Sequence, residues 1–340
     1  MVFTVRCSGS PYEIGQDHGR QADAHIKSSM EFYSGLFQRT AGLAWDEVQK
    51  IALKFVPSIQ SKWPTLLEEM QGIADAAGLQ LTDIVALNVR TEITFGMFTD
   101  ACTAVGWQTP DTVYLAQNWD WMEEQRDNIL LYHIEQDGYP AIQYLAEAGL
   151  IGKIGLNSAG VGVCVNAIRA KGMDPTKLPM HLALRLLLNS TTMQAAVGVM
   201  EKYGMASSCH FLVGDPSGTL GLEWTHLGLQ TLQPKDNRIH HANHLLLEHP
   251  GVVDTNWIPD SEYRTRRIEE LTDKIDDVSA KSIQAVFLDE GNYPGSICKT
   301  ASGSSTVATL FNIVMDLKKA RADVIMGKPN APDETLTLKF

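Results

Sequence analysis

The chain changes character at Cys102, and this change limits the folds that the sequence can adopt. The first hundred residues read mainly as helix, with predicted helices over residues 11–37, from residue 44 to residue 77 with a break at Trp63-Pro64, and over residues 81–97 with Thr82 as its cap. Ser10, Pro11 and Glu13 supply a capping box with proline at the first helical position. From Cys102 onward, short apolar runs between turn signals predict strands instead, beginning with residues 102–108.

Beyond Cys102 the predicted strands and helices come in blocks. Strands are expected over 112–117, 128–134, 141–145, 151–156 and 161–166, helices over 180–188 and 191–203, strands over 210–213, 219–224, 229–232 and 238–242, helices over 261–275 and 279–288, and strands over 305–316, 321–326 and 335–340. The absence of a steady β-α-β alternation argues against a doubly wound sheet or a TIM barrel. We therefore expect an α+β fold with antiparallel sheets covered by helices, in one domain of residues 1–340.

Composition indicates which kinds of partner and which cellular compartment to expect for this chain. The chain has 340 residues, 44% of them hydrophobic, a net charge of −12 and no block of Lys or Arg, so a nucleic-acid partner is not expected. The five cysteines are widely spaced, with no C-x-x-C pair, which is typical of a reducing compartment. We find neither a signal-peptide core nor a run of about 18 apolar residues, and the final Leu338-Lys339-Phe340 is no peroxisomal address. A cytoplasmic location without a membrane partner is expected.

Cys102 has two interpretations. A single cysteine in an apolar context is usually a small buried hydrophobic residue. If the peptide bond before it is cut, however, the thiol shares its residue with a free α-amine, whose pKa near ~8 lets it take the proton of the thiol without a histidine. The thiolate is the nucleophilic form of cysteine.

Two further groups of residues carry polar side chains of interest. The run Gln117-Asn118-Trp119-Asp120 ends a predicted strand, and it is either a turn with a packed tryptophan or the source of a carboxylate, Asp120, that orients Cys102. The histidine-rich run at residues 238–244 resembles a metal site at first sight, but no Asp, Glu or Cys stands at ligand spacing, so we interpret it as a strand end and expect no metal. There is no G-x-S-x-G elbow, no P-loop and no dinucleotide fingerprint, and Gly160-Val161-Gly162 is interpreted as a turn.

Taken in order along the chain, a series of short motifs resembles the acyl-coenzyme A:isopenicillin N acyltransferase family, peptidase family C45 of the N-terminal-nucleophile hydrolases. The motifs are Pro11-Tyr12-Glu13-Ile14-Gly15 with His18-Gly19, Trp63-Pro64, Leu87-Asn88-Val89-Arg90-Thr91-Glu92, Cys102-Thr103, Gln117-Asn118-Trp119-Asp120, Glu147-Ala148-Gly149, Gly155-Leu156-Asn157-Ser158-Ala159-Gly160, Gly221-Leu222-Glu223, Asn243-His244, Asn292-Tyr293-Pro294, Ser296-Ile297-Cys298 and Thr309-Leu310-Phe311-Asn312.

The resemblance implies a four-layer αββα sandwich that is made as a precursor. It implies self-cleavage between Ala101 and Cys102, which leaves a small helical chain of residues 1–101 and a large catalytic chain of residues 102–340 that stay associated. Cys102 would be the nucleophile, Asp120 a carboxylate of the site, and Asn243 a side-chain amide that holds the oxyanion. Thr225 and Ser305 match hydroxyl-bearing family positions linked to processing or activity. Thr306 stands where the penicillin branch of the family has an arginine.

The implied activity is transfer of an acyl group from acyl-CoA to 6-aminopenicillanic acid or isopenicillin N, with acyl-CoA as substrate and no cofactor or metal. Two alternatives remain at this stage: an amide hydrolase or synthase for other small N-acyl amines, such as β-alanyl amines, and an uncleaved protein without catalysis. The second alternative rests on Ala101, because the penicillin enzymes usually have glycine there and a Cβ limits the backbone shapes open to the scissile bond. With its different C-terminal tripeptide, the chain resembles a cytosolic paralogue.

Overall fold

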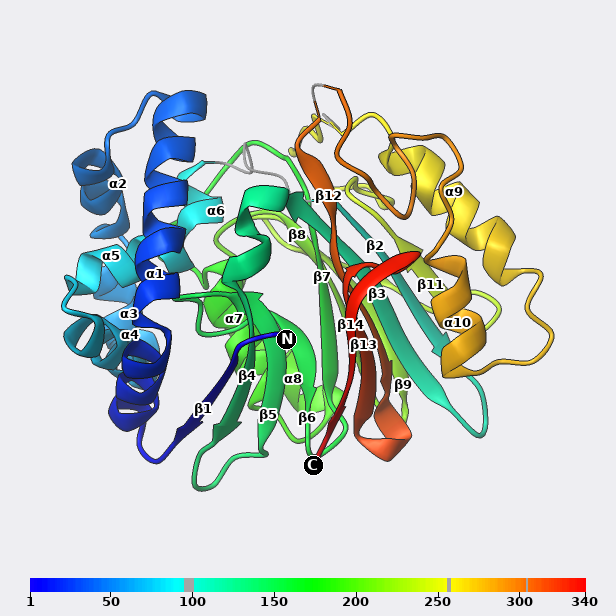
Figure 1. The fold of residues 1–340 in the computed structure, drawn as a ribbon, viewed down its shortest axis with the longest axis horizontal. Coiled ribbons are helices and arrows are strands. Elements are labelled where there is room, and N and C mark those ends of the chain that lie inside the picture. Colours follow the sequence, from blue (N-terminus) through cyan, green and yellow to red (C-terminus); the bar gives the residue numbers. More distant parts are fainter. Residues whose placement is uncertain (95–100, 256–257, 304) are drawn as a thin grey trace.

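Two β-sheets lie face to face in the protein, and helices cover both outer faces (Figure 1). The structure is a computed structural model, and it describes residues 1–94, 101–255, 258–303 and 305–340. The α+β class and the four αββα layers are thereby confirmed.

The elements have the following bounds. The helices are α1 (Pro11–Ala41), α2 (Trp45–Ala52), α3 (Val56–Lys62), α4 (Pro64–Ala77), α5 (Leu81–Asn88), α6 (Arg90–Ile93), α7 (Met180–Leu188), α8 (Met193–Tyr203), α9 (Ser261–Thr272) and α10 (Ala280–Val286), with short 3₁₀ turns η1 (Glu123–Asn128) and η2 (Leu317–Lys319). The strands are β1 (Thr4–Ser8), β2 (Ala101–Gln108), β3 (Val113–Met122), β4 (Ile129–Glu135), β5 (Ile142–Glu147), β6 (Ile154–Asn157), β7 (Gly162–Ala167), β8 (Cys209–Asp215), β9 (Gly218–Trp224), β10 (Leu229–Leu232), β11 (Arg238–His241), β12 (Val307–Asp316), β13 (Arg321–Lys328) and β14 (Ala331–Lys339).

The two sheets differ in size and in the helices that cover them. The eight-stranded sheet has the order β1-β4-β5-β6-β7-β8-β9-β10, and the six-stranded sheet has the order β11-β2-β3-β12-β13-β14. Every pair of neighbours is antiparallel except β1 with β4. Helices α1, α7 and α8 contact the eight-stranded sheet, while α9 and α10 contact the six-stranded sheet (Figure 1). Within the described residues, no helix combines the length and apolar character needed to cross a bilayer.

The helical section is held tightly by a close crossing of α1 and α4. Helix α1 begins as expected, because the Ser10 backbone N–H donates to Glu13 Oε2 at 2.8 Å and Pro11 follows at the first helical position. Gly15 and Gly72 then let the two helices approach: a Cβ at Gly15 would lie 2.0 Å from the backbone oxygen of Glu69. The crossing therefore depends on glycine at these positions.

Several details of the helical section differ from the sequence prediction, and one is a further break at residues 53–55 that separates α2 from α3. Residues 4–8 form strand β1, which pairs in parallel with β4, so the predicted small chain is not entirely helical. Only Val5 and Cys7 of this strand are buried, and an alternation this short is too weak a signal to predict a strand. The helix expected over 81–97 is split into α5 and α6, and its cap is Gln80, whose N–H donates to Asp83 Oδ2 at 2.9 Å, rather than Thr82. Residues 95–97 lie outside the described part.

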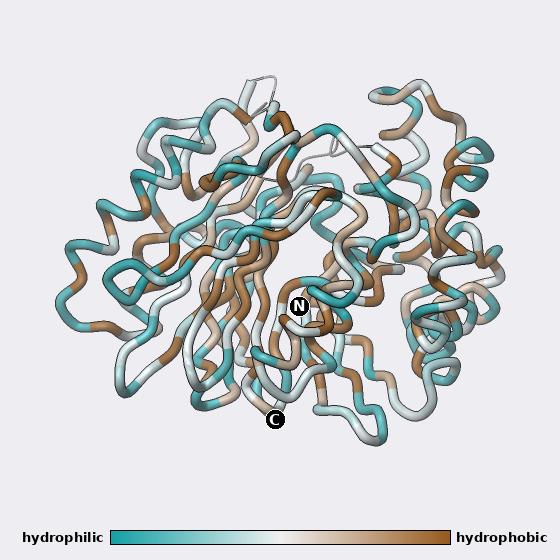
Figure 2. Tube along the Cα trace, turned by 180° about the vertical axis from the view of Figure 1, so that it is seen from behind, coloured by the Kyte–Doolittle hydropathy of each residue, from teal (hydrophilic) through white to brown (hydrophobic). Residues whose placement is uncertain are grey.

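The space between the sheets forms the main core, and it contains buried polar contacts as well as apolar ones. Figure 2 shows hydrophobic residues concentrated along the central strands. The Gln117 side chain of β3 makes two hydrogen bonds with the main chain of Val165 in β7. Its Nε2 donates to the Val165 carbonyl at 2.6 Å, and its Oε1 accepts from the Val165 N–H at 3.1 Å. Along β2, Cys102 and Ala104 belong to this core, whereas Val105 packs with α9 and α10 on the outer face.

Candidate active site

Cys102 lies at the N-terminal end of β2, beside the central strand β3 of the six-stranded sheet. Residues 95–100, which precede the strand, lie outside the described residues. In the register of the two strands Cys102 is opposite Trp119 and Ala101 is opposite Asp120. Cys102 is 0% exposed, so in the single uncut chain the sulfur is sealed from solvent.

Two side chains hold the main chain of Cys102. The Cys102 N–H donates to Asn243 Oδ1 at 2.9 Å, and Arg264 Nη1 donates to the Cys102 carbonyl at 2.5 Å. Arg264 Nη2 also donates to Asn243 Oδ1 at 2.8 Å, which joins the two side chains to each other. The backbone on both sides of the Cys102 Cα is therefore fixed by groups that come from distant parts of the sequence.

The sequence pattern does not mark Arg264 as a residue of the site. It is fully buried on α9, where Nη1 also donates to Thr103 Oγ1 at 3.1 Å and Nε pairs with Asp260 Oδ1 at 2.7 Å. An Asp and an Arg four residues apart on a helix rich in charge are typical of a solvent-exposed ion pair, so the pattern gives no sign of burial. The guanidinium, with its planar set of five donors, is suited to bind several oxygens at once.

The orientation of Asn243 follows from its neighbours. Its Oδ1 faces two donors, Cys102 N and Arg264, while its Nδ2 donates to the Ala167 carbonyl at 3.0 Å. The Asn243 backbone N–H donates to Ser261 Oγ at 2.7 Å. Asn243 thus lies beside Cys102, and its N–H₂ group engages a carbonyl. The predicted oxyanion role stays a prediction.

Asp120 lies near Cys102 along the strands but faces the other way. Cys102 and Trp119 share the inner face, and side chains alternate along a strand, so Asp120 points to the outer face under α9. The pleat thus places the carboxylate and the thiol on opposite faces of the sheet, and the orienting role of Asp120 stays a prediction. Asp120 Oδ1 accepts from Thr309 Oγ1 at 2.6 Å, and in the described part of the chain Oδ2 has no hydrogen-bond partner.

The outer face carries a cluster of four charged groups: Asp120, Asp260, Arg264 and Lys299. Burial raises the pKa of Asp120 to about 7, although Lys299 and Arg264 act in the opposite direction. Asp260 binds both cations, with Lys299 Nζ at 2.6 Å from Oδ2. Burial and then the charge of Arg264 lower the pKa of Lys299. Asp120 lies opposite Ala101 in this cluster, and Arg264 binds the Cys102 carbonyl. The pKa of about 7 means that the Asp120 carboxyl changes its charge near neutral pH.

The remaining predicted residues occupy separate places. Thr225 is buried just beyond β9, where its Oγ1 accepts from the N–H groups of Leu227 and Gly228 and so stabilises a turn. Ser305 pairs through its backbone with Ser302. Thr306 is exposed, and its carbonyl accepts from Glu123 N at 3.1 Å. The structure thus brings Cys102, Ala101 and Asn243 together with Arg264, while the tasks of Thr225, Ser305 and Thr306 stay predictions.

The histidines of the run 238–244 have protein partners. His240 contacts Thr272 Oγ1 at 2.8 Å, His241 contacts Glu223 at 2.9 Å, and His244 contacts Ser261 Oγ at 2.7 Å. Among the described residues, no group of three or more His, Cys, Asp or Glu side chains is arranged to hold a metal ion.

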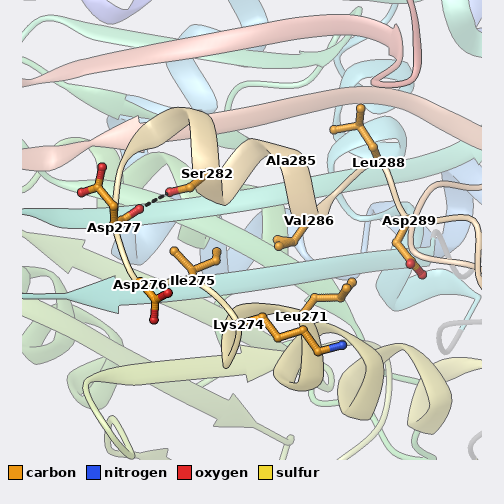
Figure 3. A pocket seen from close by; sticks show the side chains of 10 residues that line it. All are labelled: Leu271, Lys274, Ile275, Asp276, Asp277, Ser282, Ala285, Val286, Leu288 and Asp289. Carbon is orange, nitrogen blue, oxygen red and sulfur yellow. Dashed lines mark hydrogen bonds between the residues drawn. The ribbon is translucent and has the colours of Figure 1, made fainter.

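A surface pocket opens between α10 and the end of α9 (Figure 3). It is lined by Leu271, Lys274, Ile275, Asp276, Asp277, Ser282, Ala285, Val286, Leu288 and Asp289, and Ser282 Oγ donates to the Asp277 carbonyl at 2.8 Å within it. None of these residues belongs to the site around Cys102.

Comparisons with known proteins place this geometry in a family. Residues 107–331 match the profile of the family described as acyl-coenzyme A:6-aminopenicillanic acid acyl-transferase. The chain is 38% identical over 345 residues to the acyl-coenzyme A:6-aminopenicillanic-acid-acyltransferase 40 kDa form of Emericella nidulans, covering 100% of this chain and 96% of that protein. Among solved structures it is similar to penicillin V acylase from Agrobacterium tumefaciens, with a TM-score of 0.48 and 15% identity over 70% of this chain and 86% of that chain. The family match and the full-length relative show that this chain belongs to the acyl-coenzyme A:6-aminopenicillanic acid acyltransferase family and is an acyltransferase.

Proposed function

We propose that the chain cuts itself between Ala101 and Cys102 and then transfers an acyl group from acyl-CoA to the amine of 6-aminopenicillanic acid or isopenicillin N. The observation that supports this most is the grip of Asn243 and Arg264 on the backbone N–H and carbonyl of Cys102, at 2.9 and 2.5 Å. Strand β11 pairs with β2 only from Ala104 to Trp107, so these two buried side chains take the place of a strand partner and fix the main chain of Cys102 at a defined position.

In the proposed cleavage, the Cys102 sulfur attacks the Ala101 carbonyl, the C–N bond breaks and the backbone nitrogen of Cys102 takes up a proton. Water then hydrolyses the resulting thioester, which leaves a carboxylate on Ala101 and a free α-amine and thiol on Cys102. Because Asn243 Oδ1 already accepts from this nitrogen, the new amine would be held where it forms.

In the proposed transfer, the α-amine accepts the proton of the thiol, and the thiolate attacks the thioester carbonyl of acyl-CoA. The carbon–sulfur bond to CoA breaks, and the amine returns the proton to the departing CoA thiol. The acceptor amine then attacks the S-acyl group, an amide forms and Cys102 is restored. Asp120 faces away from the sulfur, so we assign it to the electrostatics of the new amine rather than to direct contact with the thiol.

The assay is release of CoA thiol from phenylacetyl-CoA by the purified protein, with and without 6-aminopenicillanic acid. The proposal predicts release that increases with the acceptor, formation of the N-acyl product, and no release by Cys102→Ala. Thiol release that does not depend on the acceptor, together with hydrolysis of other N-acyl amines such as β-alanyl amines, would favour the alternative amidohydrolase or amide synthase.

A further inference from the structure

One buried carboxylate, Glu223 on β9, binds four donors from a single stretch of chain. Its Oε1 accepts from His241 Nε2 at 2.9 Å and from Leu246 N at 2.6 Å. Its Oε2 accepts from Leu247 N at 3.0 Å and from His249 Nε2 at 3.1 Å. Glu223 is 0% exposed, and all four donors lie within residues 241–249. The side chain therefore acts as a clamp on this stretch.

The clamped stretch carries Asn243 to the nucleophile. It begins at the end of β11, in the six-stranded sheet, whereas Glu223 belongs to the eight-stranded sheet, so the clamp crosses the interior between the two sheets. Asn243 follows His241 by two residues and accepts from Cys102 N at 2.9 Å. A shift of the stretch would therefore move the Asn243 amide relative to Cys102.

Glu223 is also one end of a buried polar row beneath the site. In register, Asn166 of β7 is opposite His210 of β8, and His210 is opposite Glu223. The His210 ring donates from Nδ1 to Asn166 Oδ1 at 2.9 Å and stacks on the His241 ring with centroids 3.6 Å apart. The next residue after Asn166 is Ala167, whose carbonyl binds Asn243 Nδ2. Asn166, His210 and Glu223 thus form a connected polar row, and the residue after Asn166 binds the Asn243 side chain.

The negative charge of Glu223 suits this task. Burial opposes the charge, but the hydrogen bonds from His241, Leu246 and His249 and the charge interaction with His241 hold the pKa of the carboxyl below its ordinary value. An ionised carboxylate has two oxygens that only accept, which matches four donors. A glutamine of the same shape has one accepting oxygen and would turn its N–H₂ group toward donors.

We propose that Glu223 is a positioning residue of the acyl-transfer site, whose carboxylate holds residues 241–249 so that Asn243 stays on the main chain of Cys102. The clamp is a property of the fold, and its effect on turnover rests on the function proposed above.

The clamp is tested by hydrogen–deuterium exchange with Glu223→Gln. The variant should raise exchange at the N–H groups of Leu246 and Leu247 about tenfold or more, because charge-assisted hydrogen bonds are lost. The matched control is Glu69→Gln, which removes a buried carboxylate that pairs with Arg185 at 2.8 Å in another part of the molecule. It should leave exchange in residues 241–249 unchanged. If the N–H groups of Leu246 and Leu247 exchange in Glu223→Gln at the same rate as in wild type, the proposal is overturned.

The effect on catalysis is tested by a double-mutant cycle with Asn243→Ala. Glu223→Gln should lower kcat/KM about tenfold or more in the wild-type background, mainly through kcat, and by less than about twofold when Asn243→Ala is already present. Equal losses in both backgrounds would show that Glu223 does not act through Asn243 and would overturn the positioning role. If wild type transfers no acyl group, the proposed function fails, whereas the exchange experiment still decides the clamp.

A milder variant covers the case in which Glu223→Gln does not fold. His249→Ala removes one of the four donors and leaves the Glu223 carboxylate in place, and the His249 side chain is 4% exposed. It should raise exchange at Leu246 and Leu247 about threefold and lower kcat/KM about threefold. In the Asn243→Ala background it should cause no loss of kcat/KM. Unchanged exchange at Leu246 and Leu247 would contradict the clamp.

Discussion

At the scale of single residues, the charge of the buried Asp120 carboxyl depends on pH near neutrality. Burial raises its pKa in the folded chain from 3.8 to about 7, so between these values the unfolded chain is ionised while the folded chain keeps the proton. The stability that this group contributes is complete below about pH 4 and is lost as the pH rises through 7.

The prediction concerns Asp120→Asn, compared with its parent in a Cys102→Ala background that keeps the chain in one piece. Between pH 5 and pH 8 the free energy of unfolding of the parent should fall relative to the variant by roughly 3 kcal/mol, because the amide never has to ionise. Urea unfolding at the two pH values measures this difference. A difference that is the same at pH 5 and pH 8 would show that the buried carboxyl does not titrate in this range.

The site residues that could be predicted from the sequence are those that belong to a short motif of the family. Cys102 and Asn243 were placed by the family resemblance, and the structure brings them within a hydrogen bond of each other. Arg264 was missed because its buried contacts involve residues far away in the sequence, while its local pattern is that of a surface helix. The face of the sheet to which the Asp120 side chain points depends on the register between β2 and β3. Local sequence patterns do not specify this register.

At the scale of elements, the crossing of α1 and α4 gives a sharp prediction about glycine. Gly15→Ala should lower the free energy of unfolding by about 1–3 kcal/mol, because the new Cβ would lie 2.0 Å from the backbone oxygen of Glu69 and the helices must separate. The measurement is the urea midpoint in the same Cys102→Ala background.

The control for this prediction is Gly35→Ala on the same helix. A Cβ there meets only the end of the Arg39 side chain, at 3.0 Å, which can move away. This change should leave stability unchanged or raise it by up to about 1 kcal/mol through helix propensity. Equal destabilisation by both substitutions would mean that the close crossing is not the cause.

Elements were predictable where the local pattern was strong and long enough. Helix α7 has the predicted bounds, and β7 lies within one residue of the strand expected over 161–166, while β6 starts three residues later than the strand expected over 151–156. Strand β1 was missed, because its five residues become a strand through pairing with β4, more than a hundred positions away. The pairing order of the two sheets was likewise not available from local patterns.

At the scale of the whole molecule, buried ion pairs join the helical section to strand β5 and to helix α7. Arg90 pairs with Glu147 at 2.7 Å, Glu147 pairs with Lys153 at 2.6 Å, and Glu69 pairs with Arg185 at 2.8 Å. Arg90 and Glu69 lie before residue 101 and their partners lie after it. Removing one member of such a pair leaves a buried charge without compensation, which typically costs about 3–5 kcal/mol. After the proposed cleavage, the two chains are therefore expected to stay together.

The intact mass of the purified protein under denaturing conditions tests self-cleavage before Cys102. We expect two chains, residues 1–101 and 102–340, for wild type, and one full-length chain for Cys102→Ala. Under native conditions both fragments of wild type should travel as one species. If the wild-type chain stays whole after long incubation and still transfers acyl groups from acyl-CoA, the proposed mechanism is wrong, because no free α-amine then exists at Cys102.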